Sequence, residues 1–301
     1  MLDPRKLRLL HEFANRGSIA AVADALDYTA SAVSQQLAAL EKEAGVALLD
    51  RTARSAALTD AGRRLVTHAT QILAAIEAAE VDIAASETVP SGRVVVSSYP
   101  TAAVAFAPPV ARQLRRHTKL TLALHQADAA ESLNQLRSGD VDIALIDDWT
   151  GTDRPKQSDT LSFHRLCHDP LVLVAPQGHR LATAQSIHLS ELTDESWIAT
   201  LKGEPSRQAL DRLLRATGSA PSMQWEFEGL DTVLTLVARG LGITIAPKMA
   251  VSTRYYHVDV RELPPPSVGR DVYAVYRTAS AHRPSVLEVF RCLRSAAQKL
   301  T

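Results

Sequence analysis

The chain has 301 residues, of which 46% are hydrophobic and 22% are charged, so it can form about two domains with sizeable cores and is not a disordered chain. It contains no apolar run long enough to cross a bilayer and no signal peptide at its N-terminus, so we expect a cytoplasmic protein with no membrane partner. The net charge is zero, and residues 1–64 carry nine basic and eight acidic side chains, so bulk charge does not by itself indicate a nucleic-acid-binding protein.

Apolar residues recur at helical spacing three times within the first 45 residues. The segments 5–15 and 19–26 each have one apolar stripe. A third segment begins after Thr29 or Ser31, either of which can cap a helix, and it ends at Gly45. Only a short turn separates the second segment from the third. Three short helices with a tight turn between the last two predict a helix-turn-helix.

A wing and a long helix are expected next. Residues 46–58 contain two short extended pieces around a basic tip, which is typical of a wing. An alanine-rich segment from about 59 to 87 follows, with Leu65, Ile72 and Ala79 spaced seven residues apart. A helix of this length cannot bury its apolar stripe alone, so we expect it to pair with the same helix of a second copy.

The remaining residues alternate between strand and helix patterns after a break at 90–92. Strands are predicted near 94–98, 120–124, 141–146, 171–175, 197–200, 224–227 and 272–276. Helices are predicted near 100–117, 128–138, 206–217, 230–239 and 284–299. Residues 148–159 are polar and rich in turn formers, so we expect a loop that crosses between two halves. The alternation predicts an α/β sheet.

One ordered set of residues spans the three short helices and the wing. Its members are Phe13, the runs 18–26 and 29–37, Leu40-Glu41, Gly45-Val46, Leu48-Leu49, Arg51, Arg54 and the run 58–62. This set resembles the helix-turn-helix segment of the LysR family of bacterial transcription regulators. Weaker similarities to the same family lie at 139–145, at 237–247 and at 178–182, where Arg180 replaces the proline usual in the family. The resemblance therefore covers nearly the whole chain.

The resemblance implies an α+β multidomain fold. It implies an N-terminal winged helix-turn-helix, a long dimerisation helix and a C-terminal two-lobed α/β effector domain of the periplasmic-binding-protein-like type. The implied boundaries are 1–58 for DNA binding, 59–88 for the linker helix and 89–301 for effector binding, with lobe I at about 92–160 and 267–301 and lobe II at about 161–266. The implied function is that of a sequence-specific transcription regulator and not an enzyme. The implied partners are double-stranded operator DNA, a small-molecule effector in the cleft and further copies of the chain, as a homodimer or homotetramer, with no cofactor.

Candidate DNA contacts lie on the third helix and in the wing. A recognition helix needs short hydroxyls for phosphates and amides for base edges, and glutamine can bond adenine at two positions. Arginines of a wing can neutralise phosphates or enter a narrow minor groove. The predicted DNA-binding residues are Thr29, Ser31, Ser34, Gln35, Gln36, Arg51 and Arg54. The alternative is that these are ordinary solvent-exposed side chains.

Candidate effector contacts follow the ends of predicted strands, where ligands of such sheets bind. We predict Ser98, Tyr99 and Thr101 after the first strand of the effector domain, and Thr200 and Phe227 in the second lobe. The alternative is that these residues are helix caps and core.

The charges near these strand ends are acidic. Asp147 and Asp148 follow the third strand, and Glu226 and Glu228 flank Phe227, whereas the sequence shows no cationic residue at these positions. These observations favour an effector with positive charge, such as a cationic amino acid or an amine.

Four other functions agree less well with the sequence. The run His164-Arg165-Leu166-Cys167-His168 offers three zinc ligands, but no second cluster accompanies it. A redox switch at Cys167 lacks a nearby resolving cysteine, because Cys292 is far along the chain. An enzyme is disfavoured since no hydrolase elbow, phosphate loop or zinc-protease motif occurs. A solute-binding protein would share the α/β half but would need an export signal and no residues 1–60.

Overall fold

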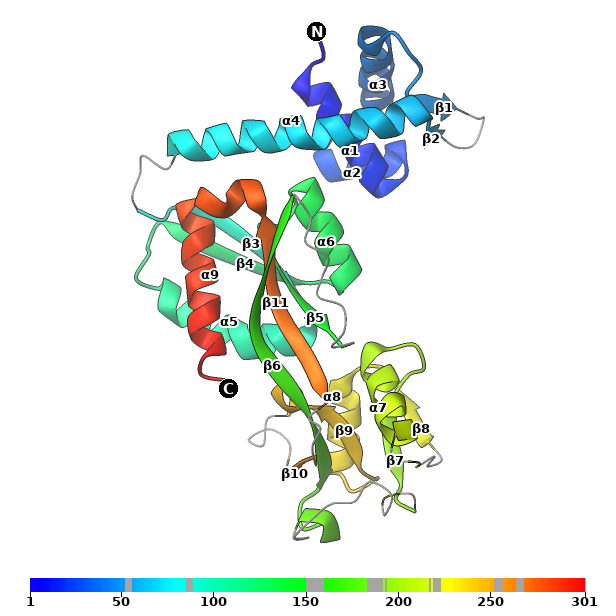
Figure 1. The fold of residues 1–301 in the computed structure, drawn as a ribbon, viewed down its shortest axis with the longest axis vertical. Helices are drawn as coiled ribbons and strands as arrows, with labels where there is room; N and C mark the ends of the chain where they lie inside the picture. The colour runs from blue at the N-terminus through cyan, green and yellow to red at the C-terminus, as the bar shows by residue number, and fades with distance from the viewer. Residues whose placement is uncertain are drawn as a thin grey trace.

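The computed structural model describes residues 1–51, 56–84, 89–149, 160–182, 192, 194–216, 218, 223–251, 257–263 and 268–300, and the following statements concern those residues. Three parts follow one another along the longest axis of the molecule (Figure 1). The N-terminal helices and one long helix lie at one end, a first lobe lies in the middle and a second lobe lies at the other end.

Three short helices form the N-terminal part, as the sequence predicts. They are α1 (Pro4–Arg16), α2 (Ile19–Leu26) and α3 (Ala30–Ala44). Ser18 caps α2 and Thr29 caps α3, because each hydroxyl accepts a backbone N–H of the first helical turn. Asp27, which ends α2, has a φ of 56°, and this left-handed conformation makes the turn to α3 short. The inner faces of the three helices share one apolar core.

A short hairpin and a long helix follow. The strands β1 (Leu49–Arg51) and β2 (Ala56–Leu58) pair antiparallel, which confirms the two extended pieces of the wing; its tip at 52–55 lies outside the described residues. The helix α4 (Asp60–Ala84) begins directly after them. Gly62 allows α4 to lie against the start of the hairpin, because a Cβ there would be 2.2 Å from the carbonyl oxygen of Leu48.

The first lobe is a sheet covered by helices. Its elements are β3 (Gly92–Ser98), α5 (Pro100–Leu114), β4 (Leu120–Gln126), α6 (Ala129–Ser138), β5 (Ile143–Asp148), β11 (Gly269–Arg277), η4 (Thr278–His282) and α9 (Pro284–Ala297). The strand β3 pairs in parallel with β4 and β5, and β11 pairs antiparallel with β5. The helices α5 and α9 cover one face of this sheet, and α6 packs against β5 (Figure 1).

The second lobe is built on the far half of a long strand. Its elements are β6 (Leu161–Pro176), η1 (Arg180–Ala182), β7 (Trp197–Thr200), α7 (Pro205–Ala216), β8 (Met223–Phe227), α8 (Leu230–Ala238), β9 (Thr244–Pro247), η3 (Lys248–Ala250) and β10 (Val258–Glu262). The strands β9 and β10 pair with the end of β6, while β7 and β8 form a parallel pair of their own.

The strand β6 is much longer than the sequence pattern predicts. Its apolar stretch at 171–175 indicated a strand only there, but the strand begins at Leu161 and pairs with β11 along its first half. Leu161 and Cys167 pack in the cores of the first lobe. A lobe boundary at 161 therefore falls before a strand that belongs to both lobes, and β6 and β11 connect them.

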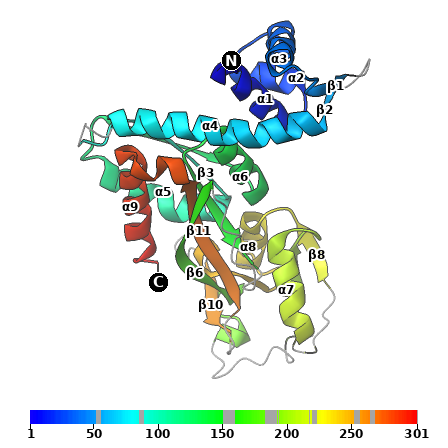
Figure 2. The same ribbon diagram turned by 45° about the horizontal axis from the view of Figure 1, so that its top comes forward.

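The helix α4 connects the DNA-binding part to the first lobe. It packs against α1 on one side and against η4 on the other, and the two views of the molecule agree on this placement (Figure 1, Figure 2). The helix α1 also contacts α6. None of the described helices is long and apolar enough to cross a membrane.

Candidate nucleic-acid interface and effector site

The helix α3 presents a polar face to solvent. Val33, Leu37 and Leu40 face the shared core, which turns the opposite side of the helix outward. Ser31, Gln35 and Gln36 are exposed, and Ser34 is half-buried. Thr29 is exposed too, but its hydroxyl accepts the N–H of Ala32 at 3.2 Å and so begins the helix. The residues predicted on α3 are therefore wholly or partly accessible to solvent, and their hydroxyl and amide groups are of the kinds that can bond phosphates and base edges.

Tyr28 is a surface residue that the sequence analysis missed. It lies in the turn before α3, and 58% of its side chain is exposed. Its backbone N–H donates to the carbonyl of Ala23 at 2.9 Å, which fixes the turn. An exposed aromatic ring beside the start of α3 is a further candidate for DNA contact. The sequence signal that could have indicated Tyr28 is its position in the short Asp27-Tyr28 turn. A large side chain in so short a turn lies outside the apolar stripes of both neighbouring helices.

The hairpin is held to α3 by the half-buried carboxylate of Glu41. One oxygen of Glu41 accepts the backbone N–H groups of Leu48 and Leu49, each at 2.9 Å. Thr59 donates to the carbonyl of Ala47 at 2.8 Å and accepts the N–H of Gly62 at 3.0 Å, so the hairpin and α4 are tied together. Of the two predicted wing arginines, Arg51 ends β1 and Arg54 lies outside the described residues.

The first three predicted effector residues lie where β3 meets α5. Ser98 is fully buried, and its hydroxyl donates to the carbonyl of Tyr99 at 3.0 Å. The hydroxyl of Tyr99 is buried without a hydrogen-bond partner among the described residues, and burial raises the pKa of Tyr99. Thr101 accepts a hydrogen bond of 2.7 Å from Arg270. Since buried polar groups are almost always paired, the Tyr99 hydroxyl is an unusual feature of this place.

Arg270 organises the place where the lobes meet. Its guanidinium is 3% exposed and donates to Asp169 and Asp147 at distances between 2.9 and 3.0 Å. It also lies 4.8 Å from the ring centroid of Tyr99 and 5.0 Å from that of Trp149. The pKa of Arg270 is raised, because Tyr99, Asp169 and Asp147 together outweigh the effect of burial, so it stays charged.

Trp149 joins the two lobes at the same place. Its indole N–H donates to Asp147 at 2.7 Å, and its ring packs against the core of the second lobe. The carbonyl of Trp149 accepts a 2.9 Å hydrogen bond from Arg212 of α7. These contacts hold the lobes together at the end of β5.

The other two predicted effector residues lie side by side in the second lobe. Thr200 and Phe227 are paired at the ends of the parallel strands β7 and β8. The hydroxyl of Thr200 lies 2.8 Å from that of Ser206. Arg207, which is 5% exposed, donates to the Thr200 carbonyl at 3.2 Å and to Glu226 at 2.7 Å. In each lobe, at least one predicted effector residue is therefore hydrogen-bonded to a buried arginine: Thr101 to Arg270 and Thr200 to Arg207.

The expectation that no cationic residue lies near these strand ends is wrong. Arg270 neutralises Asp147, and Arg207 neutralises Glu226. Both arginines were missed because the sequence does not distinguish a buried arginine from a surface one. The partners of Arg270 come from β5, β6 and α5, far away in the chain.

The three candidate metal ligands of 164–168 do not converge. His164 stacks on Tyr276, with ring centroids 5.0 Å apart, and Cys167 is buried in the core of the first lobe. His168 instead lies 2.8 Å from a carboxylate oxygen of Asp271. Among the described residues, no group of three His, Cys, Asp or Glu side chains is placed to hold a metal ion.

Comparison with known proteins agrees with both parts of the fold. Residues 4–63 match the bacterial regulatory helix-turn-helix of the lysR family, and residues 87–298 match the LysR substrate binding domain. A probable hydrogen peroxide-inducible genes activator from Streptomyces viridosporus is 29% identical over 310 residues, covering 98% of this chain and 97% of that protein. The RuBisCO operon transcriptional regulator of Allochromatium vinosum is 26% identical over 287 residues, covering 93% and 92%.

Solved structures show the same fold. A full-length OxyR variant from Pseudomonas aeruginosa superposes with a TM-score of 0.73 at 21% identity, covering 99% of this chain and 95% of that one. The chain belongs to the LysR family of transcription regulators. It is a DNA-binding regulator and not an enzyme, and its effector-binding domain modulates the binding of DNA. Regulators of this family bind DNA and small-molecule effectors and form oligomers.

Proposed function

We propose that α3 reads the operator in the major groove, with Ser31, Gln35 and Gln36 facing the DNA and the wing residues Arg51 and Arg54 contacting its backbone. The observation that carries this is the exposed polar face of α3 opposite its buried stripe. Glutamine reaches two atoms of adenine, while a serine hydroxyl suits a phosphate or a base edge. Since the bound DNA is that of the cell itself, we infer a cytoplasmic location.

A gel-shift experiment tests this assignment. Full-length protein is titrated onto DNA from upstream of its own gene, with non-specific competitor DNA present. We expect Gln35→Ala to weaken binding by about 1–3 kcal/mol, or roughly fivefold to 150-fold. Gln208→Ala, an exposed glutamine on α7, serves as the control and should bind like the wild type. Equal affinity of Gln35→Ala and the wild type would remove Gln35 from the interface.

We infer that the effector binds where the lobes meet, beside the groups gathered round Arg270 and Arg207. Ser98, Tyr99 and Thr101 form its wall in the first lobe, and Thr200 and Phe227 form its wall in the second. The buried, unpartnered hydroxyl of Tyr99 supports this, because a ligand oxygen or nitrogen would pair with it. An effector that binds one arrangement of the lobes better than another shifts the populations of the two.

The paired charges of this site favour an effector that carries both signs. A purely cationic effector was suggested by four acidic residues, but Asp147 and Glu226 already pair with arginines. We therefore propose a small amino acid or related zwitterion, whose carboxylate suits an arginine and whose ammonium suits an acidic side chain.

Thermal-shift measurements separate these chemistries. Arginine and lysine are compared with cadaverine, which lacks a carboxylate, and with succinate, which lacks an amine. We expect stabilisation by an amino acid and not by the other two classes. Stabilisation by cadaverine alone would restore the cationic effector, and stabilisation by succinate alone would exclude both proposals. Thr101→Val should reduce the shift, since it removes the hydroxyl that orients Arg270.

Peroxide is a second candidate signal, because relatives are named as hydrogen peroxide-inducible genes activators. The two cysteines of this chain do not favour thiol-based sensing. Cys167 and Cys292 are both buried in the first-lobe core, and burial raises the pKa of Cys167 to about 11. The thiolate is the reactive form, so such a thiol reacts slowly with peroxide.

A further inference from the structure

A cavity lies between the DNA-binding part and the first lobe, away from the place where the lobes meet. It has a volume of about 780 Å³, is open to solvent on one side, and is lined by α1, the middle of α4, the end of α6 and the junction of β11 with η4. This volume is within the range of small-molecule sites, which are roughly 300–1,000 Å³. The cavity therefore has the size of a metabolite site and lies between the DNA-binding part and the first lobe.

The walls of the cavity carry an excess of positive charge. Arg8 lies on the α1 side and Arg137 on the α6 side, both exposed, while Arg277 and Arg283 line it from the first lobe. The only acidic lining residue among those described is Glu12, which pairs with Arg16 at 2.7 Å. A concave surface with several arginines and one paired carboxylate attracts anions.

The four arginines differ in how firmly they are held. Arg283 donates to Asp142 at 2.6 Å, and Arg277 donates to the carbonyls of Leu136 and Val141, each at 2.8 Å. These contacts hold Arg277 and Arg283 in place on the first-lobe side of the cavity. The guanidinium of Arg137 donates to the side-chain oxygen of Asn134 at 3.2 Å, and Arg8 makes no ion pair with the described acidic residues. Arg8 and Arg137 are thus the side chains best able to turn toward a ligand.

The remaining lining suits an organic anion better than an inorganic one. Apolar side chains of α4, among them Leu73 and Ile76, form one wall, and Thr278 and Gln71 add neutral polar groups. Carboxylate and phosphate groups match the planar fork of arginine, while the carbon frame of an organic ligand can pack on the apolar wall.

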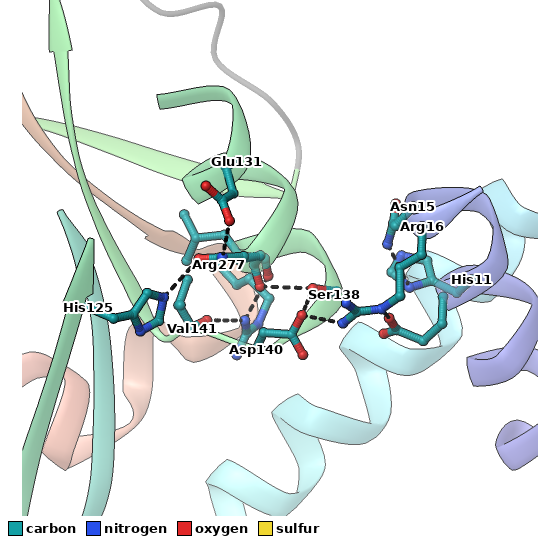
Figure 3. Close-up of polar contacts among 12 residues, drawn as sticks. His11, Asn15, Arg16, His125, Glu131, Ser138, Asp140, Val141 and Arg277 are labelled. Carbon is teal, nitrogen blue, oxygen red and sulfur yellow. Dashed lines mark hydrogen bonds and ion pairs between the residues drawn. The ribbon is translucent and has the colours of Figure 1, made fainter. Parts of the chain in front are cut away.

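The helix α1 and the end of α6 are joined by an ion pair beside the cavity. Arg16 of α1 pairs with Asp140, which directly follows α6, and Asp140 also accepts a 2.8 Å hydrogen bond from Ser138 (Figure 3). A ligand that reaches both Arg8 and Arg137 would join α1 to α6 a second time. Its binding would therefore favour the arrangement in which the helix-turn-helix is held on the first lobe.

We propose that this cavity binds a small organic anion bearing carboxylate or phosphate groups, and that the bound anion holds the DNA-binding helices on the first lobe. The site is separate from the effector site at Arg270. It gives the chain a second input that acts on the position of the recognition helix rather than on the angle between the lobes.

Calorimetric titration of the full-length protein tests the proposal. The probes are citrate and 3-phosphoglycerate, which distinguish a carboxylate from a phosphate ligand, and glycerol is the neutral comparison. We expect binding of at least one anion and no binding of glycerol. Arg8→Gln and Arg137→Gln should each weaken binding about tenfold, the effect of removing one charge-assisted hydrogen bond. Arg115→Gln, an exposed arginine at the end of α5, is the matched control and should bind like the wild type.

Two further measurements locate the bound anion. Hydrogen exchange should slow in α1 and α6 on addition of the probe. Asp140→Asn removes the ion pair with Arg16 but no lining side chain, and we expect it to weaken probe binding as well, because the joined arrangement becomes less populated. Protection confined to the β3–α5 junction would place the anion at the effector site and overturn the proposal. So would equal affinity of the arginine variants and the wild type, or no binding of either anion at millimolar concentration.

Discussion

The guanidinium of Arg270 donates to the carboxylate of Asp147 at 2.9 Å and so joins the start of β11 to the end of β5. The same guanidinium donates to Asp169 of β6. Three strands of the connecting sheet therefore meet at one buried cation. Any change in the angle between the lobes must adjust these contacts or move them together.

Removing this cation should destabilise the effector domain. Arg270→Met leaves the carboxylate of Asp169, which is 2% exposed, without its partner. Breaking a buried ion pair by removing one partner costs about 3–5 kcal/mol. Urea unfolding followed by circular dichroism should show a lower midpoint for the effector-domain transition. Arg165→Gln removes an ion pair whose arginine is 52% exposed, and the midpoint should change little. Similar midpoints for both variants would contradict the central role of Arg270.

Local sequence signals predicted the DNA-binding part well. Thr29, which caps α3, and Gly45, which ends it, act on neighbouring backbone groups, so their effect can be inferred from adjacent residues. The exposed face of α3 also follows from the helical spacing of its apolar residues. Most strands and helices of the effector domain could be predicted for the same reason, but β9 and β10 were not among the predicted strands.

The features that could not be predicted depend on contacts between distant segments. The first half of β6 could not be predicted, because residues 162–169 are largely polar and do not alternate with apolar residues. Their burial is set by packing against β11 and α9. The burial of Arg270 depends on Asp169 and Thr101, which lie 101 and 169 positions away in the chain. The cavity beside Arg8 requires α1 and α6 to meet, and no local pattern specifies that contact.

Gly62 should be sensitive to the smallest possible substitution. In Gly62→Ala the new Cβ would lie 2.2 Å from the Leu48 carbonyl oxygen, so backbone must shift. We expect the DNA-binding part to lose about 1–3 kcal/mol of stability, the usual cost of overpacking. Thr67→Ala, at an exposed position of the same helix, should change stability by less than about 0.5 kcal/mol. Thermal unfolding of both variants measures the difference, and an unchanged Gly62→Ala would show that α4 can move away freely.

The stability of the N-terminal helices should fall as pH decreases below neutrality. The pKa of His11 lies below its ordinary value of 6.5, because burial disfavours the charged ring and Arg8 adds to the effect. The unfolded chain therefore takes up a proton near pH 6.5 while the folded chain does not, and this loss of stability grows as pH falls from 6.5 toward the folded pKa. The pKa of nearby Glu12 is raised by burial, which acts in the opposite sense at lower pH.

Comparing the wild type with a variant that lacks His11 isolates the contribution of this histidine to the pH dependence of stability. His11→Gln cannot be protonated, so the stability difference between wild type and variant should shift in favour of the variant as pH falls below 6.5. Thr67→Ala removes no titratable group and should leave the pH dependence as it is in the wild type. A difference between wild type and His11→Gln that does not vary with pH would show that His11 is protonated equally in both states.

The thiols should be unreactive in the folded protein. Burial raises the pKa of Cys167 to about 11 and also raises that of Cys292, so little thiolate forms at neutral pH. Ellman's reagent should detect both thiols only after denaturation, and hydrogen peroxide should not change the gel shift. The variant Cys167→Ala should respond to peroxide as the wild type does. Rapid reaction of Cys167 in the native state, with a changed gel shift, would support peroxide sensing instead.

The exposed apolar stripe of α4 should carry the pairing of two chains. Ile72 is 38% exposed although it is a large apolar residue, and it belongs to the stripe that repeats every seven residues. Ile72→Glu would place a carboxylate in a helix–helix contact, where burying an unpaired charge is costly. Sedimentation equilibrium should then show that the dimer dissociates at a protein concentration at least about tenfold higher than for the wild type.

Thr67→Glu is the control for this prediction. It adds the same charge about 140° away round the helix, so it should leave assembly unchanged if the pairing surface follows the stripe. Equal dissociation of both variants would place the contact on a different face of α4.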